Sequence, residues 1–208
     1  MDFMEIRNLY HIDGNVGYSK ETIRKAINKF GRLPSVLTDY YQQLGKHRDL
    51  NHSDYHLCEP GKLDFLVYGD YLCFYKREDP IYWYIDMEHL ESDNPPVYQR
   101  IVIDSYTYVY DTLESDTLEE FLCVMAYYHA GFCLPYKSGV KRCTIQQVNA
   151  IEKSFQRKPY NLSKWPQFYG NDCDEVIQVY KENTYCQVSC ACTSKEQLEK
   201  IKGCLLAL

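Results

Sequence analysis

Four carboxylates crowd one short stretch of the sequence, where they could serve acid–base catalysis or bind a basic partner. They are Asp86, Glu88, Glu91 and Asp93, and Tyr98 follows shortly after them. A catalytic carboxylate pair needs one acid in an apolar pocket, because burial raises the pKa of that acid. This stretch is instead charged and ends at Asn94-Pro95-Pro96, which is typical of a loop. The pattern favours a solvated surface or a partner contact over catalysis.

Ten cysteines offer metal binding and thiol chemistry as further possibilities. Cys186, Cys190 and Cys192 could bind zinc together with Cys173, but structural zinc sites use two closely spaced pairs of ligands. In an extended strand these three cysteines would share one face with Val188, which favours cysteines packed in a core. Neither a Cys-x-x-Cys redox motif nor an export signal accompanies them, so free thiols are predicted.

Histidines and nucleophiles give weaker signals. His52, His56 and Cys58 have ligand spacing for one face of a helix, but the residues around them are poor helix formers. Surface-loop histidines are therefore expected there, and His129 is expected to pack at the end of an apolar helical stripe with a local hydrogen bond. Neither a Gly-x-Ser-x-Gly elbow nor a glycine-rich phosphate loop is present. The sequence predicts a non-enzymatic protein that needs no metal or cofactor.

The net charge of −6 hides a strong asymmetry along the chain. Residues 78–120 carry twelve carboxylates and one arginine, a formal charge of −11, whereas residues 121–164 carry +6. The acidic groups either scatter over several loops or gather into a face that attracts a basic partner. Tyrosine outnumbers phenylalanine 21 to 8, and its polar tip suits a surface that meets a partner. An acidic chain is a poor binder of nucleic acid, because phosphates need clustered lysine and arginine.

The elements that must position these residues can be located from periodicity and capping. Helices are predicted from Ser19 to Gly31, from Ser35 to Gly45, from about Asp116 to Gly131, after Thr144 and after Ser194. Strands are predicted over 63–67, 71–76, 81–86, 97–102, 106–110, 175–181 and 184–193, with a turn at Tyr68-Gly69-Asp70. Residues 1–18 and 46–61 are predicted to be irregular.

This order of elements predicts an α+β fold, a mostly antiparallel sheet with helices packed around it. A single domain over residues 1–208 is the simplest organisation, with its C-terminal part, residues 135–208, formed by a helix, a hairpin and a final helix. No apolar run is long enough to cross a bilayer, and residues 1–14 lack the pattern of a secretory signal. A cytoplasmic protein without membrane contact is therefore expected.

Three stretches in this order resemble the SUKH superfamily. The family opening of helix, Leu-Pro link and aromatic-rich helix is similar to residues 19–45, SKETIRKAINKFGRLPSVLTDYYQQLG. The family's two strands, aspartate-rich loop and "dPPVy" motif resemble residues 71–100, YLCFYKREDPIYWYIDMEHLESDNPPVYQR. The family's closing helix resembles residues 116–131, DTLEEFLCVMAYYHAG. The family's usual Asn-Gly after the second helix is here Leu44-Gly45-Lys46, so the following loop is expected to differ. Residues beyond about 135 match no family motif.

The resemblance implies a SUKH-like α+β domain, with its core motifs in residues 19–131, and a function in protein binding. Bacterial members resemble one another as immunity proteins that bind and neutralise toxins, often nucleases. Fungal relatives include a regulator of cell-wall glucan synthesis. We therefore expect an immunity protein whose partner is a basic toxin domain and whose contacts include Asp86, Glu88, Glu91, Asp93 and Tyr98. A regulator or scaffold is the first alternative, and a hydrolase or metal-dependent enzyme is the second.

Overall fold

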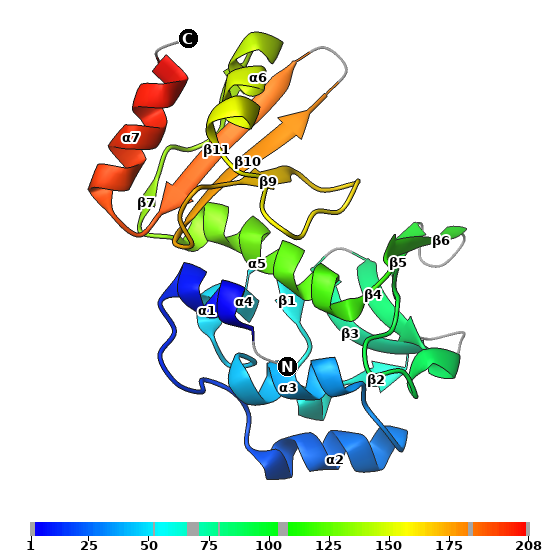
Figure 1. Cartoon of the computed structure of the whole chain (residues 1–208). Coiled ribbons are helices and arrows are strands. Elements are labelled where there is room, and N and C mark those ends of the chain that lie inside the picture. Colours follow the sequence, from blue (N-terminus) through cyan, green and yellow to red (C-terminus); the bar gives the residue numbers. More distant parts are fainter. Residues whose placement is uncertain are drawn as a thin grey trace. The chain divides into compact units, whose positions relative to one another are not determined.

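The computed structural model describes residues 3–51, 53–65, 71–78, 80–103, 108–182 and 185–206. The chain divides into two compact units, one formed by residues 14–122 and the other by residues 3–13 together with the chain from residue 123 onward (Figure 1). Each unit has its own antiparallel sheet with helices beside it, so the predicted α+β class is confirmed. The prediction of one domain over 1–208 stays a prediction. The predicted turn at Tyr68-Gly69-Asp70 and the candidate metal ligand His52 lie outside the described residues.

The first unit begins with two helices that the sequence predicted. Helix α2 (Lys20–Phe30) starts at Ser19, whose Oγ accepts a hydrogen bond from the Thr22 amide at 3.2 Å, and ends at Gly31, where φ is +80°. Helix α3 (Ser35–Gln43) begins at Ser35, as predicted, with Pro34 as its N-cap and without a side-chain cap. The carbonyl of Asp93 takes the place of a side-chain cap, because it accepts a hydrogen bond from the Val36 amide at 3.1 Å.

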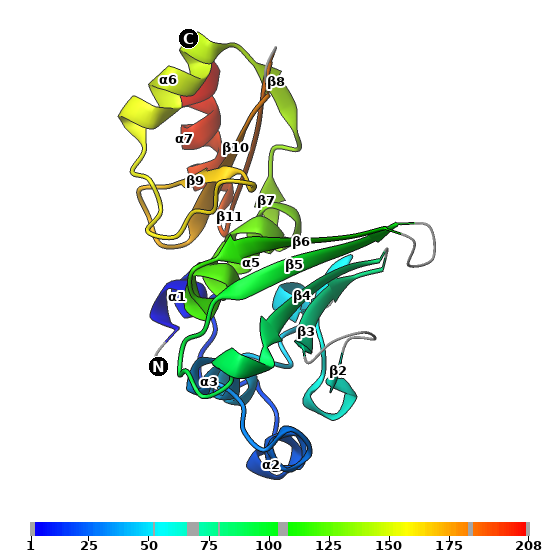
Figure 2. The ribbon, with the colours of Figure 1, turned by 90° about the vertical axis from the view of Figure 1, so that its right-hand side faces the viewer.

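The sheet of the first unit has the strand order β1-β3-β4-β5-β6, with β2 paired to β3 (Figure 2). Its strands are β1 (Tyr55–Leu57), β2 (Asp64–Phe65), β3 (Tyr71–Arg77), β4 (Ile81–Asp86), β5 (Val97–Ile103) and β6 (Tyr108–Ser115). Short helices α4 (Arg48–Asn51), η1 (Pro60–Lys62) and η2 (Met87–His89) occupy the connections. The irregular structure predicted for residues 46–61 is therefore wrong where α4, β1 and the start of η1 form.

Aromatic side chains form the core on one face of this sheet. Phe121, near the start of helix α5 (Leu118–Cys133), packs edge-to-face against Phe74 and Tyr75 and lies 5.9 Å from the Trp83 ring. Side chains alternate along a strand, so Trp83 and Ile85 point to this core, as predicted, and both are fully buried. The neighbours of Trp83 on β4 therefore project from the opposite face of the sheet.

The second unit contains helix α1 (Met4–Tyr10), the remainder of α5, and a sheet of order β7-β11-β10-β9 in which β8 pairs with β11. Its strands are β7 (Tyr136–Lys137), β8 (Lys141–Cys143), β9 (Gln167–Tyr169), β10 (Glu175–Lys181) and β11 (Cys186–Cys192). Helices α6 (Ile145–Ser154) and α7 (Lys195–Leu206) lie on the same side of this sheet (Figure 2). Their buried residues pack with Ile177, Val179 and Val188 in one cluster.

Three local expectations in the second unit are corrected by tertiary contacts. Helix α1 forms within residues expected to be irregular, because Ile6 and Leu9 are fully buried and the Tyr10 hydroxyl donates to the Ala126 carbonyl at 2.8 Å. Helix α5 continues past Gly131, the predicted end, to Cys133. A side chain at Gly131 would collide with Gln178, so this glycine permits close packing instead of ending the helix. Ile145, predicted to face inward, is 51% exposed.

Candidate protein-binding surface

The acidic stretch forms a fixed loop that connects β4 to β5 in the first unit. Asp86 begins it by accepting a hydrogen bond from the Glu88 amide at 3.2 Å, which caps the short helix η2. Glu91 and Asp93 both bind Arg32, at 2.8 and 3.1 Å from its two terminal nitrogens. The carbonyl of Asp93 also accepts the Ser35 hydroxyl at 3.4 Å. Side-chain and backbone contacts thus tie the loop to the end of α2 and the start of α3.

The carboxylates of this loop face solvent. The exposed fractions of the Glu88, Glu91 and Asp93 side chains are 74%, 80% and 72%. Arg32 is the cation that contacts Glu91 and Asp93, and it offsets one of their two charges. Because exposed ion pairs are worth at most about 1 kcal/mol, they leave carboxylate oxygens available to a partner at little cost. The structure therefore places four predicted residues on one loop, with Glu91 and Asp93 joined through Arg32.

Tyr98, the fifth predicted residue, belongs to a neighbouring cluster on the sheet. Its ring stacks on that of Tyr84, with centroids 5.6 Å apart and planes at 21°. The Tyr71 ring lies 4.6 Å from that of Tyr84 on the other side. Tyr84 and Tyr98 are cross-strand partners on β4 and β5, on the face opposite the one that contacts α5. We call this cluster, completed by Arg100 and Asp111, the tyrosine face.

Arg100 and Asp111 hold the tyrosine face together. The Arg100 guanidinium donates two hydrogen bonds of 2.7 Å to the two oxygens of Asp111, its cross-strand partner on β6. The same guanidinium carbon lies 4.5 Å from the centroid of Tyr71 and 5.3 Å from that of Tyr84. The hydrogen bonds to Asp111 raise the pKa of Arg100 above its ordinary value, and burial raises the pKa of Tyr84. Arg100 is therefore a permanent cation beside the neutral phenol of Tyr84.

The tyrosine face and the acidic loop are contiguous. Asp86, which opens the loop, is the cross-strand partner of Tyr71 and lies two residues after Tyr84. Its side chain therefore leaves the same face of the sheet as the tyrosine cluster. Interfaces between proteins are enriched in tyrosine and arginine at their centres and in charged groups at their rims. The arrangement suits a protein-binding surface with an aromatic centre and an acidic margin.

Apolar side chains extend this surface along β6, the last strand in the sheet order. By strand alternation Val109 and Leu113, which are 44% and 50% exposed, lie on the same face as Asp111. Tyr110 and Ile103, which are 56% and 43% exposed, lie on the opposite face. Leu113 is the cross-strand partner of Tyr98, so it adjoins the tyrosine face. Exposed apolar residues on a terminal strand are typical of surfaces that engage another chain.

The other groups considered for chemistry are placed differently. Cys186, Cys190 and Cys192 are buried with Val188 in the core of the second unit, as predicted. His129 is 1% exposed and its burial lowers the pKa to about 4, so it packs as a neutral side chain. Within the ranges that the structure describes, His, Cys, Asp and Glu side chains do not gather in groups of three that could hold a metal ion.

Sequence reasoning missed Arg32, Tyr71, Tyr84, Arg100 and Asp111. Alternation on 81–86 places Tyr82 and Tyr84 opposite Trp83, which is the one local signal for the tyrosine face. The pairing of Arg100 with Asp111 depends on the strand register, and the contact of Arg32 with Glu91 and Asp93 joins residues about sixty positions apart. Neither is encoded in a short motif.

Comparison of the chain with models of known protein families, with curated proteins and with solved structures found no match. The resemblance to the SUKH superfamily therefore stays a prediction that rests on residues 19–131. Among the described helices, none combines the length and the apolar character that a membrane crossing requires.

Proposed function

We propose that this chain is a non-enzymatic binding protein that neutralises a cognate toxin by direct contact, as immunity proteins of the SUKH type do. The observation that carries the proposal is the contiguity of the exposed acidic loop, residues 86–93, with the tyrosine face. The resemblance of residues 19–131 to the family supports the class of partner. Occlusion of the toxin's active site is the proposed mechanism.

The two parts of the surface would contribute differently to such a complex. A nuclease toxin presents basic groups to phosphate, so exposed carboxylates attract it and speed association, above all at low salt. Tyr71 and Tyr98 are partly exposed and would supply most of the affinity, because large flat side chains bury area with little loss of rotamer entropy, whereas Tyr84 and Arg100 are already buried and support them. The ring stack is already held by Arg100 and Asp111, so few side chains need to reorganise on binding.

Co-expression with the toxin encoded beside this chain tests the function directly. We expect the chain to restore growth and to co-purify with the toxin as a stoichiometric complex. A toxin that stays lethal and forms no complex would overturn the immunity function.

Charge reversal tests the acidic loop within that complex. Glu88→Lys, which leaves the Arg32 contacts intact, should slow association by several-fold at low salt and much less at high salt. Glu196→Lys is the matched control, because Glu196 is 82% exposed on α7 of the second unit. Equal effects of the two substitutions would reject the loop as the contact.

A further inference from the structure

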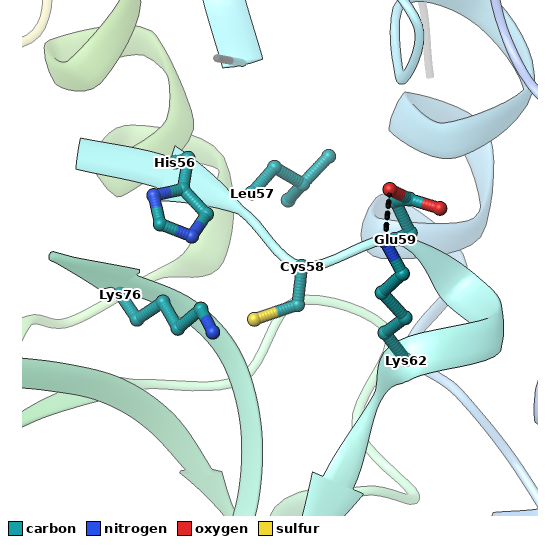
Figure 3. Close-up of a pocket in the computed structure, with 6 residues that line it drawn as sticks. All are labelled: His56, Leu57, Cys58, Glu59, Lys62 and Lys76. Atoms are coloured by element: carbon teal, nitrogen blue, oxygen red, sulfur yellow. Dashed lines mark hydrogen bonds and ion pairs between the residues drawn. The ribbon is translucent and has the colours of Figure 1, made fainter. Parts of the chain in front are cut away.

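A small pocket in the first unit contains a cysteine beside basic groups. It has a volume of about 180 Å³ and is lined by His56, Leu57, Cys58, Glu59, Lys62 and Lys76 (Figure 3). Lys76 extends toward the Cys58 thiol, whereas Lys62 turns away to form an ion pair with Glu59 at 2.8 Å. His56 and Lys76 are cross-strand partners on β1 and β3, so the pairing of these strands builds the wall. The pocket can admit a small polar molecule.

The backbone around Cys58 is held from both sides. The Cys58 amide donates to the Phe74 carbonyl at 2.8 Å, and the buried Tyr41 hydroxyl donates to the Cys58 carbonyl at 2.6 Å. Cys58 itself is 8% exposed and is one of the residues that line the pocket. This position is fixed by the sheet and by α3, as a reactive group requires.

A second thiol lies directly behind the first. Cys73 on β3 is 7% exposed, its thiol donates to the Tyr75 carbonyl at 3.7 Å, and its sulfur lies close enough to that of Cys58 for the two groups to shift each other's pKa through a side-chain hydrogen bond. This hydrogen bond and the positive charge of Lys76 lower the pKa of Cys58. The same contact and burial raise the pKa of Cys73 well above its usual value. The pair therefore consists of one thiol that ionises readily at the pocket and one protonated thiol behind it.

We propose that Cys58 and Cys73 form a peroxide-reactive redox site, in which Cys58 is the attacking thiol and Cys73 the resolving thiol. The oxidant is hydrogen peroxide. The Cys58 thiolate attacks one peroxide oxygen, the O–O bond breaks, and the departing hydroxide takes up a proton as water, which leaves a sulfenic acid on Cys58. The Cys73 sulfur then attacks the Cys58 sulfur, and the S–O bond breaks. A second water leaves, and a Cys58–Cys73 disulfide remains.

Lys76 and Cys73 have distinct physical roles in these steps. Lys76 stabilises the thiolate and faces the oxygen on which negative charge develops. Cys73 is within hydrogen-bond contact of the sulfur that it must attack, so the sulfenic acid is resolved before further oxidation. A dithiol reductant returns both groups to thiols, and two electrons pass in each direction. Cys73 is the cross-strand partner of Tyr84, so the site adjoins the tyrosine face, but its chemistry does not rest on the proposed function.

Peptide mapping of the full chain after treatment with hydrogen peroxide tests the proposal. We expect one disulfide, between Cys58 and Cys73, that is reversed by dithiothreitol. In the untreated chain, the pH dependence of Cys58 alkylation should give an apparent pKa below the ordinary value of about 8.5. At pH 7, Cys58 should be alkylated about tenfold faster than the exposed Cys204. Slower alkylation of Cys58 than of Cys204, or a peroxide-induced disulfide between other cysteines, would overturn the proposal.

Variants separate the two roles. Cys73→Ser should accumulate a sulfenic acid on Cys58 that a cyclic dione captures, whereas Cys58→Ser should give neither adduct nor disulfide. Lys76→Met should slow the capture several-fold, and Lys62→Met, a matched lysine of the same pocket that pairs with Glu59, should change it little. Equal slowing by the two lysine variants would contradict the role of Lys76. A dione adduct on a cysteine other than Cys58 in Cys73→Ser would contradict Cys58 as the attacking thiol. The alkylation measurement uses the chain without substitutions, so it tests the reactivity of Cys58 even where a variant fails to fold.

Discussion

The two units both contain buried cysteines, but burial and neighbouring groups shift the pKa of their thiols in opposite directions. Cys190 and Cys192 lie among aliphatic side chains of the second unit, and burial raises the pKa of both, to about 11 for Cys192. Cys58 in the first unit is also buried, but a neighbouring thiol and Lys76 lower its pKa. Burial alone therefore does not make a thiol inert, because the nearest donor and cation decide which protonation state is favoured.

The two sheets also differ in the side chains that cover their faces. The second unit covers one face of its sheet with α6 and α7 and packs Gln178 of the other face against carbonyls of α5 at 2.9 and 2.8 Å. The first unit packs Trp83 on one face and stacks tyrosines around Arg100 on the other. The helix-covered face of the second unit's sheet buries mainly aliphatic and cysteine side chains, whereas the first unit's sheet carries large amphipathic side chains on the face opposite Trp83. The second type of surface is the one suited to a partner.

The largest expected effect separates the two faces of the first sheet. Trp83→Ala should lower the free energy of unfolding by about 3–5 kcal/mol, because the indole is fully buried against Phe121 and Tyr75. Tyr82→Ala, next along β4 and half-buried on the opposite face, should cost much less. Denaturant unfolding of both variants measures the difference, and similar losses would contradict the assignment of core and surface.

A pH titration of stability tests the second unit. The pKa of His129 is lowered to about 4, below its value of about 6.5 in an unfolded chain, so the unfolded state binds the extra proton between these values. Stability should therefore fall by about 2–4 kcal/mol as the pH drops from 6.5 to 4. His129→Leu should remove most of this dependence, whereas His11→Leu, at an exposed histidine of the same unit, should leave it. An unchanged profile in His129→Leu would contradict the burial argument.

A smaller effect is expected when the tyrosine face loses its ion pair. Asp111→Asn should cost about 1–2 kcal/mol, because Arg100 is 9% exposed and keeps its charge while Asp111 is 37% exposed and partly screened. Glu91→Gln, at an exposed contact of Arg32, is the matched control and should cost less than about 0.5 kcal/mol. Thermal unfolding of both variants checks the ranking, which fails if Glu91→Gln is the more damaging.

The smallest effect compares helix caps in the two units. Thr144→Ala removes the hydroxyl half of the capping box of α6, and Ser19→Ala removes the single side-chain cap of α2. Each should cost about 1 kcal/mol, because one backbone amide loses its acceptor in each case. The larger loss is expected at Thr144, because its hydroxyl also donates to the Gln147 side chain that caps the amide of residue 144. Thr144→Ser and Ser19→Thr, which keep a hydroxyl, should be nearly neutral in the same unfolding measurement. A larger loss at Ser19 would contradict the ranking.

Local patterns were enough to predict elements whose signals are complete within a short stretch. The cap at Ser19, the capping box at Thr144 and the alternation of Ile81–Asp86 and Cys186–Cys192 are all confirmed. Helix α1 was missed because its N-cap is Phe3, which gives no capping signal, and because its stability comes from distant partners. The predicted acidic loop lies in one place because it is continuous in sequence.

Sites assembled across the sheet could not be predicted in the same way. Cys58 meets Cys73 because β1 pairs with β3, and a search for Cys-x-x-Cys does not detect a pair fifteen residues apart. Arg100 meets Asp111 because β5 and β6 pair in one register. A shift of that register by one residue would place these two side chains on opposite faces. The chemistry is thus fixed by strand pairing that a single sequence does not display.

The membership of α1 in the second unit has a consequence for how the chain folds during synthesis. The Tyr10 hydroxyl bonds to Ala126, and the Tyr127 hydroxyl to Glu5, across separations of 116 and 122 residues. The ribosome therefore releases α1 long before its partners exist, and all of residues 14–122 emerge in between. Contacts of such long range slow folding and prolong the exposure of apolar surface. Ile6 and Leu9, which are fully buried in the folded chain, therefore stay exposed until the chain from residue 123 onward has emerged.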